Sequence, residues 1–116
     1  MDRRIKIAIP TDDGKIIRSR FSSSRGFMVA TVNSGKIIHR EMRWNLLSEM
    51  ITSEDGYFYN LADCEVVIVK EIGPAHSQIL NIKNITIART CETEIMTAFL
   101  QYLKCSHLLS EAGQIA

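Results

Sequence analysis

Three polar segments of the sequence carry side chains that could bind a ligand. The first is the turn at residues 11–14, and the second is a loop at residues 18–26 that holds three arginines and four serines. The third, residues 72–77, contains a Gly-Pro pair that should start a helix, because proline suits the first helical position. Guanidinium groups, hydroxyls and the N–H groups of a helix N-terminus all donate hydrogen bonds to anions. The candidate ligand-binding residues are Ser19, Arg20, Ser22, Arg25, Gly73, Ala75 and His76.

Metal ligation by side chains has one candidate in these segments. His76 carries the imidazole that metals most often use in proteins, although a histidine in a first helical turn can also be plain polar surface. The three cysteines, Cys64, Cys91 and Cys105, lack the paired spacing of a zinc site. Cys64 is expected in the core. Cys91 either packs or, beside a helix N-terminus, serves as a reactive thiol.

The sequence contains no pattern of residues that would run a reaction. It lacks a G-x-S-x-G elbow, a Walker loop and a G-x-G-x-x-G loop. The first predicted strand has no carboxylate in its middle, where a two-metal nuclease would need one. These observations predict a binding protein rather than an enzyme.

The basic residues gather in the first third of the chain. The net charge is only +1, yet residues 3–43 hold ten Lys or Arg against three Asp or Glu, whereas residues 44–116 hold four against nine. Such asymmetry indicates an anion-binding or nucleic-acid surface, or only a solvated face of a sheet. A nucleic-acid or protein-interaction module that uses the basic hairpin 18–43 is therefore the alternative to a small-ligand site.

The apolar pattern predicts a β-β-β-α-β-α-β-α order of elements. Strands are expected at residues 5–9, 27–32, 37–44, 65–69 and 84–88, and helices at residues 53–62, from Gly73 onward, and in a last segment capped by Thr90 or Thr93. The two final crossovers should be right-handed, which makes strands one, four and five parallel. The prediction is a three-layer α/β/α fold with strand two antiparallel.

Three further expectations concern details of these elements. Pro10 should end the first strand, and the third strand should lie at the sheet edge. In the third strand, alternation places Ile38 on one face with Arg40, Met42 and Trp44, and Ile37 on the other face with the remaining residues. The helices should bury the apolar residues Ile79, Leu80, Ile82, Ile95, Met96, Phe99, Leu100 and Leu103.

The length of 116 residues predicts one domain, residues 1–116. The chain starts without the apolar stretch of a signal peptide and contains no run long enough for a membrane helix. An odd number of cysteines suits a reducing compartment. We therefore expect a soluble cytoplasmic protein with no membrane partner. Its ligand should bind outside the carboxyl ends of the parallel strands.

Five stretches of the sequence resemble a known family. They read IKIAIPTDDG, SRFSSSRGF, VNSGKII, LADCEVVIVKEIGPAHSQIL and ITIARTCETEIMTAFLQYL. Together they cover nearly the whole chain, which resembles the dinitrogenase iron-molybdenum cofactor biosynthesis family of nitrogenase accessory factor-like domains. The resemblance implies a ribonuclease H-like motif with strand order 3-2-1-4-5. It also implies an iron-sulfur or molybdenum-containing cluster as ligand, with metallocluster assembly proteins as partners.

The chain departs from the family pattern in the basic loop. Where the family usually has histidine, phenylalanine and glycine, this sequence has Arg20, Phe21 and Ser22. A guanidinium stays protonated and does not ligate a metal. The residues therefore favour an anionic cluster or oxyanion held by charge and N–H donors, with His76 as the nearby imidazole. A diverged member that binds no ligand stays open as a further alternative.

Overall fold

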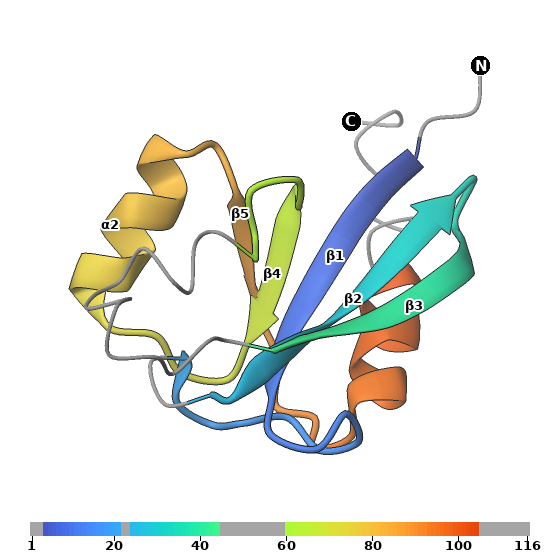
Figure 1. The fold of residues 1–116 in the computed structure, drawn as a ribbon, viewed down its shortest axis with the longest axis horizontal. Helices are drawn as coiled ribbons and strands as arrows, with labels where there is room; N and C mark the ends of the chain where they lie inside the picture. The colour runs from blue at the N-terminus through green and yellow to red at the C-terminus, as the bar shows by residue number, and fades with distance from the viewer. Residues whose placement is uncertain (1–3, 22–23, 45–59, 105–116) are drawn as a thin grey trace, which may run out of the picture.

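The sheet has the predicted strand order. A computed structural model describes residues 4–21, 24–44 and 60–104 of the chain. The strands are β1 (Arg4–Thr11), β2 (Gly26–Asn33), β3 (Lys36–Trp44), β4 (Val66–Val69) and β5 (Thr86–Arg89). They lie in the order β3-β2-β1-β4-β5 (Figure 1). β2 is antiparallel to β1 and β3, while β4 is parallel to β1 and β5, which confirms the predicted α/β sheet with its antiparallel second strand.

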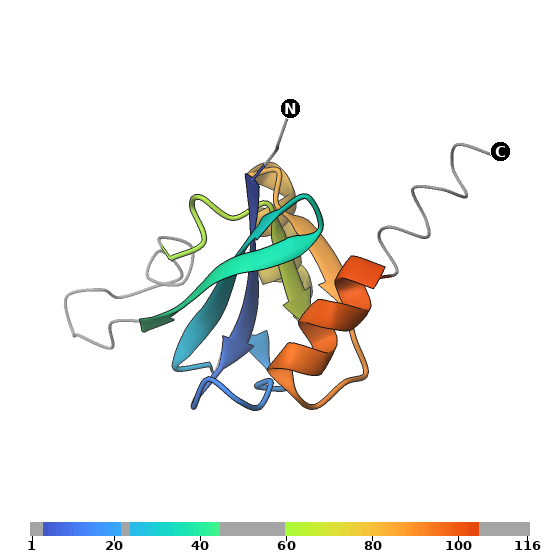
Figure 2. The same ribbon diagram turned by 90° about the vertical axis from the view of Figure 1, so that its right-hand side faces the viewer.

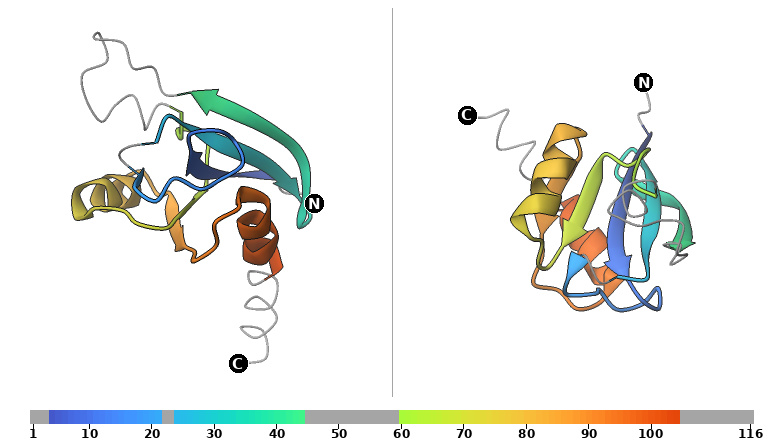
Figure 3. Two further views of the ribbon diagram at one scale, coloured as in Figure 1. Left: turned by 90° about the horizontal axis from the view of Figure 1, so that it is seen from below. Right: turned by 60° about the vertical axis from the view of Figure 1, so that its left-hand side comes forward.

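Two helices cover opposite faces of this sheet. α2 (Pro74–Ile82) packs on one face, and the helical residues 95–104 pack on the other (Figures 2 and 3). β4 contributes to the core on both faces of the sheet, because its alternate side chains belong to two separate core clusters. All four of its residues are buried, as expected for an unbroken apolar central strand. Of the helix predicted at residues 53–62, residues 53–59 lie outside the described residues, and residues 60–62 form a turn.

α2 begins and ends at recognisable signals. Pro74 occupies the first helical turn after the N-cap Gly73, as predicted. At the other end Asn84 adopts a left-handed conformation (φ 62°), and the Ile85 N–H donates to the Leu80 carbonyl over 2.9 Å, as in a Schellman motif. Leu80 and Ile85 are both buried. The prediction that Ile82 is buried is wrong, because it lies two residues past Leu80 and so on the opposite side of the helix, where it is 75% exposed.

The expected end of the first strand at Pro10 is wrong by one residue, since β1 continues to Thr11. The Pro10 carbonyl accepts the Arg18 N–H over 2.9 Å, so its ring nitrogen faces the same side of the strand, away from β2. The pairing of β1 with β4 involves only Ile7 and Ala8 and does not reach this position. A proline is tolerated here because no ladder hydrogen bond is lost.

β3 lies at the sheet edge as predicted, but its face assignment is wrong at two residues. A register shift between Thr31 and Val32 pairs Val32 with Ile37 and Thr31 with His39. Ile38 is thereby the extra residue of a β-bulge and is half exposed, while Ile37 packs against the core beside the helical residues 95–104. An alternating pattern cannot reveal a bulge, so the prediction assigned Ile37 and Ile38 to the wrong faces of the strand.

The helical residues 95–104 bury a narrower stripe than expected. Ile95, Ala98 and Phe99 are buried, whereas Met96 and Leu100 are 37% and 58% exposed. The helix begins at Ile95, whose N–H donates to the Lys15 carbonyl, so neither predicted threonine is its cap. No helix in the described part of the chain is both long and apolar enough to span a membrane.

Candidate functional site

The loops that follow β1, β4 and β5 come together at one end of the sheet, at the bottom of Figure 1. Two of them are directly joined. The Ser19 carbonyl accepts the Glu71 N–H over 3.0 Å, and the Phe21 N–H donates to the Glu71 carbonyl over 3.2 Å. Arg20 and Glu71 thus form a parallel β-bridge. The structure therefore connects the basic loop to the chain that enters α2.

A network of side chain to main chain hydrogen bonds shapes the turn after β1. The buried Thr11 hydroxyl donates to the Ile16 carbonyl (2.6 Å) and accepts the Gly14 N–H (3.0 Å). The Asp13 carboxylate accepts the N–H groups of Ile16 (2.9 Å) and Lys15 (2.8 Å). These bonds to the charged form lower the pKa of Asp13. The turn is thus fixed before any ligand arrives.

Asp12 ties together the two ends of the basic loop. Its Oδ2 accepts a hydrogen bond from Arg18 Nη1 (3.0 Å), and its Oδ1 accepts the main-chain N–H of Arg25 (2.9 Å). The loop then enters β2 at Gly26, where an added Cβ would lie 2.5 Å from the Arg43 carbonyl oxygen. The two ends of the loop are therefore held in place.

Two neighbouring pockets share Arg20. One, of about 350 Å³, is lined by Arg20, Phe21, Glu71, Ile72 and Gly73. The other, of about 520 Å³, is lined by Asp12, Asp13, Ile16, Ile17, Arg18, Ser19 and Arg20. Of the residues predicted from sequence, the structure thus brings Ser19, Arg20 and Gly73 together.

Phe21 links the loop to His76. The Phe21 ring is buried and contacts the His76 ring edge-on, with 5.6 Å between ring centroids. His76 is accordingly half-buried against an aromatic ring, while Ala75 is exposed in the first turn of α2. In the described residues no group of three or more His, Cys, Asp or Glu side chains could hold a metal ion. Metal ligation by His76 stays a prediction.

The three arginines of the loop differ in their partners. Arg18 pairs with Asp12, whereas the exposed guanidinium groups of Arg20 and Arg25 have no ion-pair partner within residues 4–21, 24–44 and 60–104. Arg25 contacts Asp12 only through its main chain. The remaining candidate, Ser22, lies outside the described residues.

Arg43 of the basic hairpin is used inside the fold. Arg43 pairs with Asp63 (Nη2 to Oδ2, 3.0 Å) and with Glu41 (3.1 Å), and Lys6 also pairs with Asp63 (3.1 Å). The hydrogen bonds between Arg43 and Asp63 lower the pKa of Asp63 well below its usual range and raise the pKa of Arg43. Only 17% of the Arg43 side chain is exposed. The hairpin therefore offers a nucleic acid less free charge than its sequence indicates.

The cysteines take different positions. Cys64 is buried in the core as predicted, and burial raises the pKa of its thiol to about 12. Cys91 is exposed, so the packing role is wrong for it. Cys105 lies outside the described residues.

Sequence reasoning missed Asp12 and Glu71 as organisers of the site. The two aspartates after the first strand were recognised in the sequence. Nothing in the sequence shows that Asp12 binds the two ends of the basic loop and that Asp13 binds main-chain N–H groups of the turn. Glu71 contributes through its main-chain N–H and C=O groups, and any residue type except proline has both groups at this position. Both roles depend on which groups the fold brings together, and the partners of Glu71 are distant in the sequence.

Comparison with known proteins gives one family. The model of the family described as dinitrogenase iron-molybdenum cofactor matches residues 3–104. No curated protein matches the chain.

Solved structures share the fold. A candidate dinitrogenase from Methanocaldococcus jannaschii has a TM-score of 0.71 at 16% identity, covering 88% of this chain and 90% of that one. The apo form of the orange protein from Desulfovibrio gigas has a TM-score of 0.70 at 20% identity, covering 85% and 87%. A candidate NifB protein from Thermotoga has a TM-score of 0.64 at 17% identity, covering 86% and 87%.

Proposed function

The chain belongs to the dinitrogenase iron-molybdenum cofactor family, and from this premise we propose that it binds and carries an anionic metallocluster or oxyanion without catalysing a reaction. The ligand lies in the crevice between residues 11–26 and 72–77. One observation carries the proposal: the bridge between Arg20 and Glu71 holds a guanidinium without an ion-pair partner in the described residues next to the start of α2. Metallocluster assembly proteins are the partners this role requires.

The donor set suits an anion held by charge and hydrogen bonds. Arg20 supplies a fixed positive charge, and Ser19 supplies a hydroxyl. Oxo and thio groups of a metallocluster accept hydrogen bonds from such donors. Direct ligation of a metal would need thiolates or imidazoles, of which His76 is the one candidate in these segments.

Glu71 favours one side of Arg20 for the ligand. Its carboxylate is exposed and lines the smaller pocket, where it repels an anion. The larger pocket on the other side of Arg20 contains Ser19 and two carboxylates. Of these, Asp12 is paired with Arg18, and Asp13 accepts main-chain N–H groups of its own turn. We therefore infer that the anion binds between Arg20 and Ser19.

Titration with molybdate and tetrathiomolybdate tests the proposal. The protein is purified without oxygen, its iron, molybdenum and copper are measured, and binding of the two anions is followed by absorbance and calorimetry. Arg20→Gln should weaken binding about ten-fold or more, since it removes a charged hydrogen-bond donor. The matched control is Arg4→Gln, which removes an exposed arginine at the opposite end of β1. A protein that carries no metal and binds neither anion would refute the proposal and leave the ligand-free alternative.

A further inference from the structure

β5 forms an edge of the sheet with main-chain groups that no described residue uses. Its Thr86 N–H donates to the Glu65 carbonyl (2.8 Å), and the Thr90 N–H just beyond it donates to the Val69 carbonyl (2.9 Å). Alternate residues of a strand turn their N–H and C=O groups to opposite sides. Ile87 and Arg89 therefore direct theirs away from β4, outward from the sheet.

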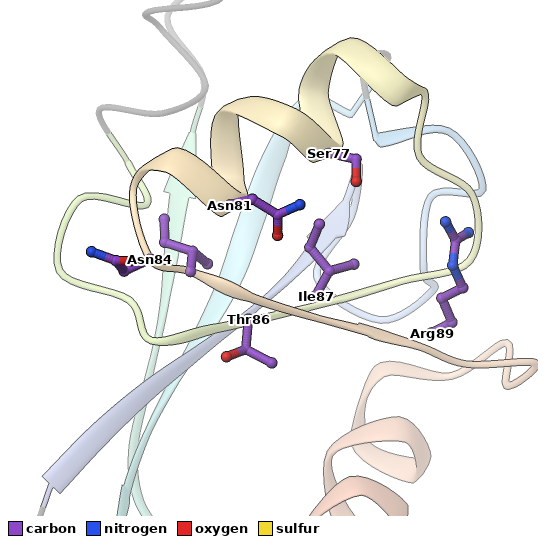
Figure 4. A pocket seen from close by; sticks show the side chains of 7 residues that line it. Ser77, Asn81, Asn84, Thr86, Ile87 and Arg89 are labelled. Atoms are coloured by element: carbon purple, nitrogen blue, oxygen red, sulfur yellow. The ribbon is translucent and has the colours of Figure 1, made fainter.

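A groove of about 600 Å³ runs along this edge, between β5 and α2. Figure 4 shows Ser77 and Asn81 extending from α2 toward the strand and Ile87 pointing up between them. Arg89 stands at one end of the groove and Asn84 at the other. The wall thus offers hydroxyl and amide groups, an apolar side chain and unpaired main-chain donors and acceptors.

The charge of the groove has one sign. Its lining residues include Arg89 and no carboxylate, and the exposed Lys83 follows at the C-cap of α2. β5 contains no proline, and its register with β4 is continuous, so two common devices that block strand addition are absent from it. An occupant must therefore be extended, to use the outward groups, and acidic, to match the two cations.

We propose that this edge binds an extended acidic segment of a partner protein as a sixth strand of the sheet. Main-chain hydrogen bonds to Ile87 and Arg89 supply the affinity common to strand addition, and a carboxylate on the segment pairs with the Arg89 guanidinium. The groove includes Ser77 of the segment 72–77, but it shares no lining residue with the two pockets that contain Arg20. The inference does not depend on the proposed function.

Nuclear magnetic resonance on the whole ¹⁵N-labelled chain tests the inference. The probes are a capped eight-residue peptide of alternating Thr and Glu, its Thr-Lys counterpart, and the Thr-Glu peptide with N-methylated alternate amides. The Thr-Glu peptide should shift the resonances of Ile87 and Arg89 and slow the exchange of their amide protons. N-methylation should weaken binding about ten-fold, because two main-chain hydrogen bonds are lost.

Variants and competing results decide the outcome. Arg89→Gln should weaken binding of the Thr-Glu peptide roughly two- to five-fold, as expected for an exposed ion pair, whereas Lys36→Gln on the opposite edge strand should not. Equal binding of the acidic and basic peptides, or no shift at either amide, overturns the inference. Concentration-dependent shifts at these amides in the free protein would assign the edge to a second copy and overturn it as well.

Discussion

Two aspartates hold the basic residues of this chain in different ways. One carboxylate oxygen of Asp12 accepts a hydrogen bond from the Arg18 side chain, and the other accepts the Arg25 main-chain N–H. Asp12 thus shapes the loop, while the side chains of Arg20 and Arg25 stay exposed. Asp63 binds Arg43 and Lys6, which joins β3 and β1 to the turn before β4. The difference teaches that one basic region divides into cations that stabilise the fold and cations that can face a ligand.

The largest effect should come from removing the Asp63 carboxylate. Asp63→Ala leaves Arg43, which is largely buried, without its main partner, and should lower the free energy of unfolding by about 2 kcal/mol. Urea unfolding measures the loss. Anion binding should be unchanged in the folded variant, since the Asp63 cluster is separate from the crevice. Weakened anion binding with unchanged stability would reverse the roles assigned to the two aspartates.

Removing the Asp12 carboxylate should act mainly on the anion site. Asp12→Ala frees both ends of the basic loop and should weaken tetrathiomolybdate binding about ten-fold, while stability falls by about 1 kcal/mol. Asp12→Asn provides the sharper comparison, because its amide oxygen can still accept the Arg25 N–H. Calorimetric titration should place the asparagine variant between wild type and alanine. Identical affinities for all three proteins would show that the clamp does not position the site.

A smaller effect is expected on the pH dependence of stability, through Asp63. Hydrogen bonds from Arg43 lower the folded-state pKa of Asp63, so the unfolded chain takes up this proton first as the pH falls. The stabilisation is complete above the unfolded value of about 3.9 and is lost as the pH drops toward the folded value. Below pH 5, the midpoint of urea unfolding should decrease with falling pH less steeply for Asp63→Asn than for wild type. Parallel curves would contradict this assignment.

Local patterns predicted most of the fold. The unbroken apolar run of β4, the Gly73-Pro74 start of α2 and the turn before Lys36 each carry a signal within a few residues. The errors arose where a distant partner decides. The bulge at Ile38 depends on pairing with β2, and the exposure of Leu100 depends on where its helix overlies the sheet. Ile82 is the exception, because helical spacing from Leu80 already places it on the opposite side of α2.

The meeting of the loops after β1 and β4 was predictable, but the contacts that join them were not. The carboxyl ends of the parallel strands pointed to residues 11–26 and 72–77 without any contact being known. Which arginines lack an ion-pair partner among the described residues could not be inferred, because that depends on Asp12 reaching Arg18 rather than Arg20 or Arg25. The number of basic residues in a segment can be counted from the sequence, whereas their ion pairs are known only from the folded structure.

The bridge between Arg20 and Glu71 has a consequence for the order of folding. Its two residues are about fifty positions apart in the sequence, and they lie side by side in the fold in which β1 pairs with β4. Contacts between distant segments form late, because a long loop must close first. A crevice built on this bridge is therefore incomplete in a partly folded chain, so the anion binding proposed above requires the folded protein.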